Sequence, residues 1–266
     1  KQIILDFHLH EKKTILKSEF AIQANTRNGK KVDLILDGID IKLKNLSINR
    51  RKINFKNIIF KKDFMIIPKN FIKSKDFTLQ MENHIDPSSN KSLEGLYLSN
   101  KIICTQCEPE GFRKICYSID RPDILATYEV RLRGPYNCLL SNGNQIKQTN
   151  NFAEWYDPFP KPTYLFAIVA GDLSFHQDEF ITMNKKHVSL RIYHKHEDKG
   201  KTFHAMNCIK NAMRWDEVHY QREYDLDIFM IVAIDDFNAG AMENKGLNIF
   251  NSKYVLYDEE RSTDTD

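Results

Sequence analysis

The stretch "YDLDIFMIVAIDDFN", Tyr224–Asn238, decides how this chain folds. Apolar and polar residues alternate at its start, and the run then becomes continuously apolar from Ile228 to Ile234. Alternation is typical of a strand with one buried face, whereas a short continuous apolar run is typical of a strand buried on both faces. We therefore predict a central strand here, with other elements packed on both of its sides.

A helix is predicted shortly before this strand, from Thr202 to about Tyr220. Its apolar residues recur at a spacing of three to four, which places them on one helical face. The predicted buried stripe contains Phe203, Met206, Ile209, Met213 and Tyr220, widened by Cys208, Ala212 and Trp215. The run "HVSLRIYHKH", residues 187–196, is predicted to be a further strand.

The earlier part of the chain has the pattern of β-structure. The runs "ILDFHLH" (4–10), "DFTLQME" (76–82) and "ATYEVRLRG" (126–134) alternate, and residues 30–48 do so on both sides of a turn at Asp37-Gly38. Such runs, broken by Asn, Asp, Gly and Pro, are typical of an antiparallel sandwich. We predict a mainly β, sandwich-like N-terminal domain over residues 1–174 and the N-terminal part of an α+β domain over residues 175–266.

A proline-rich segment, "DPFPKPTYLFAIVAGD" (157–172), precedes this boundary. Its three prolines, Pro158, Pro160 and Pro162, exclude a helix. We expect an elbow here, followed by a short apolar strand, "YLFAIVA" (164–170), that ends at Gly171. At the other end, the polar run "YVLYDEERSTDTD" (254–266) could cap a helix that does not follow, so we expect the chain to stop within a domain.

Composition excludes several classes of protein. The chain has 266 residues, a net charge of +3, 41% hydrophobic and 28% charged residues, as is usual for a globular protein. The lysines are scattered, so a nucleic-acid partner is not indicated. No apolar run approaches the roughly 18 residues of a membrane span, so no membrane partner is expected.

Five cysteines occur, at positions 104, 107, 116, 138 and 208. An odd number in a chain of this length argues against a disulfide framework and for a reducing compartment. Together with the lack of a signal peptide, it predicts a cytoplasmic location. The C-x-x-C pair Cys104/Cys107 could be half a zinc site or a redox pair, but buried strand cysteines are the favoured interpretation.

No metal or nucleophile motif stands out among the nine histidines and the glycines. His8/His10 and His194/His196 are H-x-H pairs on predicted strands, where each pair would share one face. Without a third ligand, exposed strand histidines are the favoured interpretation. H-E-x-x-H, G-x-S-x-G, a P-loop and the Rossmann glycines are absent from the sequence.

The segment "DFNAGAMENKG", Asp236–Gly246, follows the predicted central strand directly. Gly240 allows another chain to approach the backbone closely, and Glu243 adds a carboxylate nearby. An open backbone can pair with a peptide as an added strand, and a fixed carboxylate can hold the peptide's α-ammonium group. The alternative is a glycine-rich turn with a solvated glutamate, and the residue types alone do not separate the two.

A second acidic feature lies in "TQCEPEGFRK", residues 105–114. Gln106 and Glu108 are two residues apart, so in an extended segment both side chains leave on the same face. Pro109 keeps Glu108 out of helical geometry.

The run "GAMEN" (240–244) resembles the G-x-M-E-N exopeptidase motif of the aminopeptidase N family of zinc metallopeptidases, the gluzincin aminopeptidases. Further stretches resemble the bacterial aminopeptidase N branch of this family in the same order: residues 105–130, "LLSNGN" (139–144), residues 156–172 and residues 224–256. The resemblance extends from about residue 5 to the end of the chain. It implies a β-sandwich-like domain packed on a thermolysin-like catalytic domain.

The resemblance also implies roles for individual residues. Glu243 and Glu108 would bind the α-ammonium group of the substrate, with Gln106 beside them. Their site would lie at the interface of the two domains. Two neighbouring carboxylates repel each other unless a cation neutralises them, so an N-acetylated peptide should bind poorly.

The remaining site residues implied by the resemblance surround Glu243 in the sequence: Ala239, Gly240, Ala241, Met242 and Asn244. Gly240 and Ala241 would supply backbone contacts to the peptide, and Asn244 would help to hold the loop. Ala239 would line the pocket for the N-terminal side chain. The bacterial branch commonly has methionine there, so a roomier pocket is expected.

The family binds zinc through H-E-x-x-H and a more distant glutamate. We therefore expect the zinc ligands to lie beyond residue 266, with no catalytic or metal-binding residue in this fragment and no activity of the fragment alone. The expected enzyme is a zinc aminopeptidase that removes N-terminal amino acids from peptides. Its partners would be peptides with a free N-terminus and the remaining catalytic and C-terminal domains of the same protein.

Two alternatives stay open. One is a non-catalytic module with an aminopeptidase-like fold that binds peptides or proteins by their N-termini. The other is an epoxide-hydrolysing relative, which is disfavoured because Lys245-Gly246 follows the motif where proline would be expected.

Overall fold

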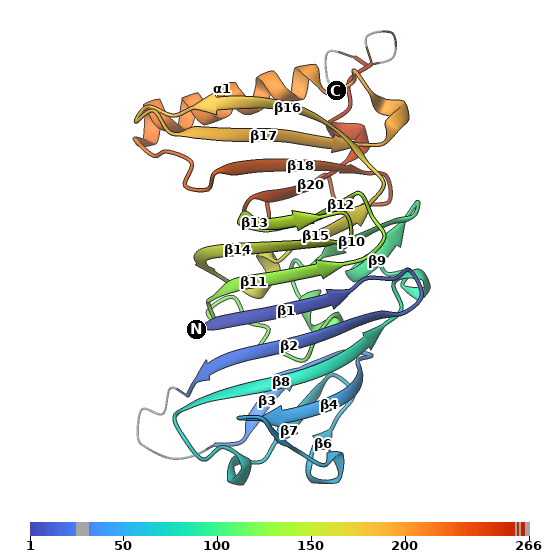
Figure 1. The fold of residues 1–266 in the computed structure, drawn as a ribbon, viewed down its shortest axis with the longest axis vertical. Coiled ribbons are helices and arrows are strands. Elements are labelled where there is room, and N and C mark those ends of the chain that lie inside the picture. Colours follow the sequence, from blue (N-terminus) through green and yellow to red (C-terminus); the bar gives the residue numbers. More distant parts are fainter. Residues whose placement is uncertain (25–31, 259, 261, 264–266) are drawn as a thin grey trace.

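Figure 1 shows the computed structural model, which describes residues 1–24, 32–258, 260, 262 and 263. Strands in four sheets dominate the described residues, and their one α-helix is α1 (Phe203–Tyr220). A mainly β fold followed by a part with helix and strands confirms the predicted fold class. Within the described residues no helix is both long and apolar enough to span a membrane.

The largest sheet has eight strands, and it alternates as the sequence predicts. Ile3, Leu5 and Phe7 of the first strand are buried, whereas the residues between them are only partly so. In spatial order the strands are β13 (Asn144–Thr149), β14 (Phe152–Lys161), β11 (Ala126–Arg133), β1 (Gln2–His8), β2 (Thr14–Gln23), β8 (Asp76–Ile85), β4 (Lys42–Ile48) and β5 (Arg51–Lys52).

Two smaller sheets complete this mainly β part of the chain. One has the order β12 (Cys138–Ser141), β15 (Ile168–Gly171), β10 (Ile102–Gln106) and β9 (Gly95–Ser99). The other has the order β3 (Leu34–Asp37), β7 (Phe64–Ile67) and β6 (Ile59–Phe60). Trp155 of β14 is fully buried, and its indole N–H donates to the Leu139 carbonyl of β12 over 2.9 Å. Apolar packing and this hydrogen bond therefore join the largest sheet to the four-stranded one.

The proline-rich segment is a strand rather than the elbow predicted from the sequence. β14 continues through Pro158 and Pro160 to Lys161 and stays paired with β11. On its other side, the pairing with β13 reaches only as far as Tyr156. The prolines therefore lie where β14 has one neighbour, a position at which a missing backbone N–H costs no sheet hydrogen bond.

The apolar strand expected over residues 164–170 is also shorter than predicted. Thr163–Leu165 forms a turn of 3₁₀-helix after Pro162, and β15 begins only at Ile168. It ends at Gly171, as expected. Proline is well suited to the start of a helical turn, and this local preference outweighs the apolar pattern here.

The last sheet contains the predicted central strand. Its spatial order is β16 (Ser174–Ile181), β17 (His187–His194), β18 (Ile228–Ile234), β20 (Leu247–Asn251) and β19 (Ala241–Met242). β18 runs parallel to both of its neighbours. In Figure 1 this sheet and α1 form one end of the molecule. The boundary predicted near residue 174 stays a prediction, although β16 is the first strand of this sheet.

β18 is buried on both faces, as its apolar run predicts. Met230 and Val232 belong to the same hydrophobic core as the N-terminal sheets. Ile231 and Ala233 belong to a second core, shared with Met206, Ile209 and Met213 of α1. One strand therefore joins two cores, because alternate side chains of a strand point in opposite directions.

The buried face of α1 is narrower than predicted. Met206, Ile209, Met213 and Glu217 are buried. The other members of the predicted stripe, Phe203, Cys208, Ala212, Trp215 and Tyr220, are exposed. A helix that crosses one face of a sheet buries only the side chains directed at it, and the apolar residues beside that line remain open.

We expect Met230→Ala in the complete protein to lower the free energy of unfolding by about 2–5 kcal/mol, because it removes most of a fully buried side chain and leaves a cavity. Ile146→Ala is the control, since Ile146 of β13 is 60% exposed, and its effect should stay within about 0.5 kcal/mol. Chemical denaturation measures both changes. Equal effects of the two substitutions would contradict the placement of β18.

Candidate functional site

The chain crosses from β18 to the edge of the sheet through residues 235–240. It then forms β19, which pairs antiparallel with β20 through Ala241↔Phe250 and Met242↔Ile249. β19 is the last strand of this sheet, so its outer backbone edge faces no other strand of the described chain. An unpaired strand edge can accept a further strand from another molecule.

Side chains in this segment point alternately inward and outward. Met242 is fully buried in the hydrophobic core shared with the N-terminal sheets, and this burial fixes the strand. Ala239, Gly240, Ala241 and Glu243 are exposed. The carboxylate of Glu243 makes no hydrogen bond or ion pair with any described residue. Burial of Met242 therefore holds the backbone, while the neighbouring carboxylate remains available.

Asn244 differs from its neighbours because it is 1% exposed. Its side-chain amide donates to the Met242 carbonyl over 3.4 Å, and its backbone carbonyl accepts a hydrogen bond from the Leu247 N–H over 3.1 Å. Its side-chain oxygen is buried and has no hydrogen-bond partner among the described residues. Gly246 follows with a φ of +80°, a conformation that favours glycine.

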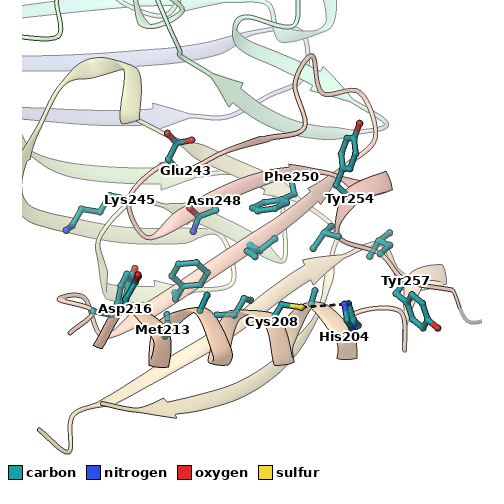
Figure 2. A pocket seen from close by; sticks show the side chains of 18 of the residues that line it. His204, Cys208, Met213, Asp216, Glu243, Lys245, Asn248, Phe250, Tyr254 and Tyr257 are labelled. Atoms are coloured by element: carbon teal, nitrogen blue, oxygen red, sulfur yellow. Dashed lines mark hydrogen bonds between the residues drawn. The ribbon is translucent and has the colours of Figure 1, made fainter. Parts of the chain in front are cut away.

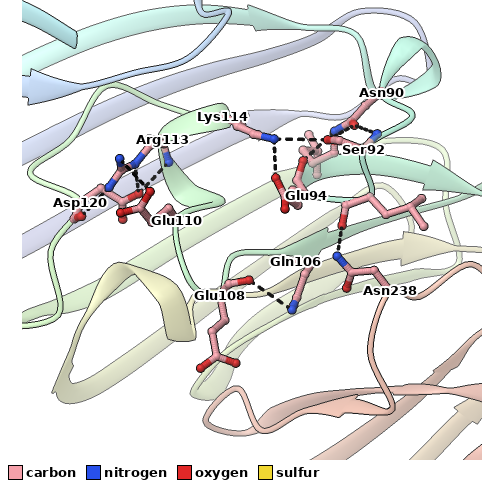
Figure 3. Close-up of polar contacts among 12 residues, drawn as sticks. Asn90, Ser92, Glu94, Gln106, Glu108, Glu110, Arg113, Lys114, Asp120 and Asn238 are labelled. Carbon is pink, nitrogen blue, oxygen red and sulfur yellow. Dashed lines mark hydrogen bonds and ion pairs between the residues drawn. The ribbon is translucent and has the colours of Figure 1, made fainter. Parts of the chain in front are cut away.

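The second acidic segment lies at the end of β10. Gln106 is 5% exposed and is the last residue of this strand. Its amide nitrogen donates to the Glu108 carbonyl over 3.5 Å, and its side-chain oxygen has no partner among the described residues. Glu108 is exposed and precedes a cis peptide bond to Pro109. Figure 3 shows both side chains directed the same way, although Glu108 lies in a turn and not in the extended segment for which the shared face was predicted.

The carboxylate of Glu108 has no partner among the described residues, whereas the nearby acids Glu94, Glu110 and Asp120 are each paired with a cation. Glu94 forms an ion pair with Lys114, and Glu110 pairs with Arg113 over 3.2 Å. Asp120 is buried, and it receives hydrogen bonds from the Arg113 side chain over 2.9 Å and from the Thr163 hydroxyl. Figure 3 shows the Glu108 carboxylate directed away from these ion pairs.

The two acidic segments approach each other along β9. The side-chain amide of Asn238 donates to the Leu93 carbonyl over 3.3 Å, just before β9 begins. Gly95 of β9 pairs directly with Gln106 of β10. The segment that carries Glu243 therefore passes beside the strand pair at whose end Gln106 and Glu108 stand, and Figure 3 shows Asn238 and Gln106 in one view.

A groove of about 1230 Å³ opens on the other side of Glu243. It lies between α1, β18 and β20, and Figure 2 shows Glu243 near its top and Lys245 at its left edge. The exposed apolar residues of the predicted helical stripe, such as Cys208, Ala212 and Tyr220, line it. Of the site residues predicted from the sequence, Glu243 alone belongs to its lining, whereas Gln106 and Glu108 do not.

Four of the five cysteines are buried, as the favoured interpretation predicts, and all five are free thiols. Burial raises the pKa of the Cys104 thiol to about 12 and that of Cys107 well above its ordinary value. Thiols with such pKa values are poor nucleophiles and poor metal ligands near neutral pH. Among the described residues, no three His, Cys, Asp or Glu side chains converge in a way that could hold a metal ion.

The histidine pairs do not share strand faces, contrary to the prediction. β1 ends at His8 and β17 ends at His194, so His10 and His196 lie beyond their strands. His194 is also 2% exposed rather than solvated, with its Nδ1 atom 2.7 Å from the Lys195 carbonyl. Period-2 alternation carries no information about where a strand stops.

Family comparison agrees with this geometry. The sequence pattern of the Peptidase M1 N-terminal domain matches residues 2–165, and that of the Peptidase family M1 domain matches residues 204–266. The chain belongs to the peptidase M1 family. This confirms the family resemblance seen in the sequence.

Members of the M1 family with similar sequences are aminopeptidases. Aminopeptidase N of Caulobacter vibrioides is 46% identical over 269 residues, which are 98% of this chain and 31% of that protein. Aminopeptidase N of Escherichia coli is 43% identical over 272 residues, 99% of this chain and 30% of that protein. The chain thus spans about a third of the length of the curated relatives it matches.

A solved M1-like structure has the same fold. The crystal structure of Legionella pneumophila aminopeptidase A in complex with aspartic acid superimposes with a TM-score of 0.91 at 30% identity. The match covers 99% of this chain and 32% of that one. The fold of this chain is therefore similar to that of the matched part of this aminopeptidase.

We expect Arg113→Leu to lower the free energy of unfolding by about 3 kcal/mol, because it leaves the carboxylate of Asp120 buried without a cation. The matched control is Arg121→Leu, which breaks an Arg–Asp pair with Asp123 at the surface and should change stability little. Thermal and urea unfolding of the two variants measure the difference. Equal stabilities would show that Asp120 does not depend on Arg113.

We expect Cys104, Cys107 and Cys116 to resist alkylation by iodoacetamide at pH 8 in the folded protein. Burial raises the pKa of each thiol, to about 12 for Cys104 and Cys116, so the reactive thiolate is rare at this pH. Mass spectrometry before and after unfolding in urea measures the change. Rapid labelling of Cys107 in the folded protein would contradict its burial and revive a redox role for the C-x-x-C pair.

Proposed function

We propose that this chain is the part of a zinc-dependent aminopeptidase that binds the free N-terminus of a peptide substrate. The observation that carries the proposal is the pair of unpaired carboxylates, Glu108 and Glu243, on two segments that pass beside each other. Neither carboxylate has a cationic partner among the described residues, although the neighbouring acids are paired. A ligand with a positive charge would complete this arrangement.

The α-ammonium group of a peptide is such a ligand. It carries three N–H donors, and the segments offer acceptors in the carboxylates of Glu108 and Glu243. A further acceptor is the side-chain oxygen of Gln106, which is buried and has no partner in the described chain. Buried polar atoms are normally hydrogen-bonded, so an atom of this kind beside a carboxylate favours a ligand with N–H groups.

The open edge of β19 suits the peptide that follows this ammonium group. A peptide in extended conformation would add to the edge as a further strand, with its backbone paired to Gly240 and Ala241. A Cβ atom at Gly240 would meet only the Tyr254 ring, at an ordinary 3.6 Å. Packing within the chain therefore does not require glycine there, which favours a role in admitting another backbone.

The other motif residues would shape and support this site. Buried Met242 and Asn244 would hold the segment in place from below. Ala239 would line the pocket for the substrate's first side chain, and its small size predicts a roomy pocket. Aspartic acid, the ligand of the Legionella relative, has a free α-amino group, in agreement with an amine-binding site in this fold.

Zinc does not fit the described residues of this chain, since they contain no cluster of ligands for it. We therefore assign no step of the reaction to zinc here. In the proposed enzyme, the metal and its ligands would come from the rest of the complete protein. The complete curated relatives are about three times as long as this chain. The residues of this chain would bind and orient the substrate, and they would exclude peptides with blocked N-termini.

The decisive experiment uses the complete protein with zinc and peptides that differ only at the N-terminus. We expect release of the first amino acid from a free peptide and no release from its N-acetylated form, because acetylation removes the positive charge. Glu243→Gln should raise KM for the free peptide about ten- to hundred-fold, the effect of losing one charge-assisted hydrogen bond. Amino-acid analysis of the products measures both.

Glu19→Gln is the matched control. Glu19 lies on the eight-stranded sheet and receives a hydrogen bond from Gln80 over 2.8 Å, which an amide oxygen can also accept. The KM of the Glu19→Gln enzyme should equal that of the unaltered enzyme. The site assignment fails if Glu243→Gln behaves like this control. Tight binding of free N-termini without cleavage would favour the non-catalytic binding module, and reading the gene beyond residue 266 for H-E-x-x-H is an independent check.

A further inference from the structure

The segment that presents Glu243, residues 239–244, is held within its own sheet by the burial of Met242, by its short pairing with β20 and by the hydrogen bonds from Asn251 and Leu247 to its backbone. β19 contributes only two residue pairs to the sheet, and both are with β20. Strands this short are marginal unless other contacts hold them. Contacts with the N-terminal part of the chain, strands β1–β15, add support on both sides of the segment.

The first contact lies just before the segment and centres on Asp236. The Ser99 hydroxyl lies 2.8 Å from the Asp236 carboxylate and 3.2 Å from its backbone N–H. The Tyr97 hydroxyl donates to the Asp236 carbonyl over 2.9 Å. Tyr97 and Ser99 are two residues apart on β9, so both side chains face the same way, and both are buried.

A neighbouring ion pair strengthens this first contact. Asp235 pairs with Lys195 and accepts a hydrogen bond from the Asn100 side chain over 2.9 Å. Burial opposes the charged form of Asp235, but hydrogen bonds from Lys195 and other neighbours outweigh it and keep the pKa of this carboxyl below its ordinary value. The loop after β18 therefore keeps a charged anchor at neutral pH.

The second contact lies just after the segment and depends on Asn142. Its side-chain amide donates to the Lys245 carbonyl over 2.9 Å. The same side chain is 1% exposed and bonds to Leu165 and Ala167 within the N-terminal part. Because its position is fixed by these bonds, Asn142 also fixes Lys245, two residues after Glu243.

We propose that Ser99 and Tyr97 are positioning residues for ammonium binding. Through Asp236 they set where the Glu243 carboxylate stands relative to Gln106 and Glu108. β9, which carries them, is hydrogen-bonded to β10, at whose end Gln106 and Glu108 lie. The same two strands thus place both halves of the amine site. This inference rests on the proposed function, and it adds residues that contact no substrate themselves.

The test compares two probes, alanine amide and N-acetyl-alanine amide, with the complete protein. Ser99→Ala should weaken binding of alanine amide about five-fold and raise KM of a free peptide similarly, with kcat nearly unchanged. Binding of N-acetyl-alanine amide should not change, because it has no ammonium group to locate. Titration calorimetry and steady-state kinetics measure these effects.

Ser141→Ala is the matched control for a purely structural effect. Ser141 is also a buried serine of the four-stranded sheet, and its hydroxyl donates to the Ala167 carbonyl over 3.0 Å rather than to a residue of the loop after β18. The Ser141→Ala substitution should lower the stability of the protein as Ser99→Ala does, yet leave the affinity for alanine amide unchanged. Equal affinities of the two variants would overturn the proposal.

A second variant keeps the test open if Ser99→Ala does not fold. Tyr97→Phe removes only the hydroxyl that donates to Asp236, and it should weaken binding of alanine amide in the same direction. Its control is Tyr128→Phe, since the buried Tyr128 hydroxyl has no partner among the described residues. An unaltered protein that neither binds alanine amide nor releases N-terminal residues would instead overturn the proposed function itself.

Discussion

The two-sided burial of β18 is the constraint on which the rest of the structure depends. Met230 and Val232 pack into the core of the N-terminal sheets, while Ile231 and Ala233 pack beneath α1. The two cores therefore cannot separate without exposing one face of this strand to water. The loop that follows Ile234 consequently begins at a fixed place, at the junction of the two parts of the chain.

After that junction, the chain forms the edge strand β19, whose outer side pairs with no other strand of the described chain. Burial of Met242 and the hydrogen bonds of Asp236 and Lys245 fix the backbone. Gly240 stays exposed, although its carbonyl accepts a hydrogen bond from the Asn251 N–H over 2.9 Å, and the Glu243 carboxylate has no partner among the described residues. Binding sites gain affinity when their groups are placed before the ligand arrives, because less ordering is needed on binding.

Local patterns in the sequence determine much of this arrangement, and long-range contacts determine the remainder. The apolar run at Ile228–Ile234 and the helical spacing before it were enough to predict β18 and α1. The width of the buried helical face was not predictable, because Trp215 and Tyr220 fit the period although no element of the described chain covers them. The bond between Ser99 and Asp236 joins residues 137 positions apart, and no periodicity reports such a pair. The roles proposed for Gln106, Glu108 and Glu243 depend on motifs that resemble those of a known family, and they stay predictions.

The distribution of paired charges is what gives the proposed amine site its chemical character. Around the site, Asp120 is held by Arg113, Glu94 by Lys114 and Asp235 by Lys195. These pairs neutralise the acids that shape the fold, and none of these cations is left for Glu108 or Glu243. In the proposed site, a cation from the chain would compete with a substrate's ammonium group, so the pairing of the structural acids would keep the two carboxylates selective for an external charge. The arrangement therefore separates acids that hold the structure from the acids proposed to bind substrate, within a few residues of each other.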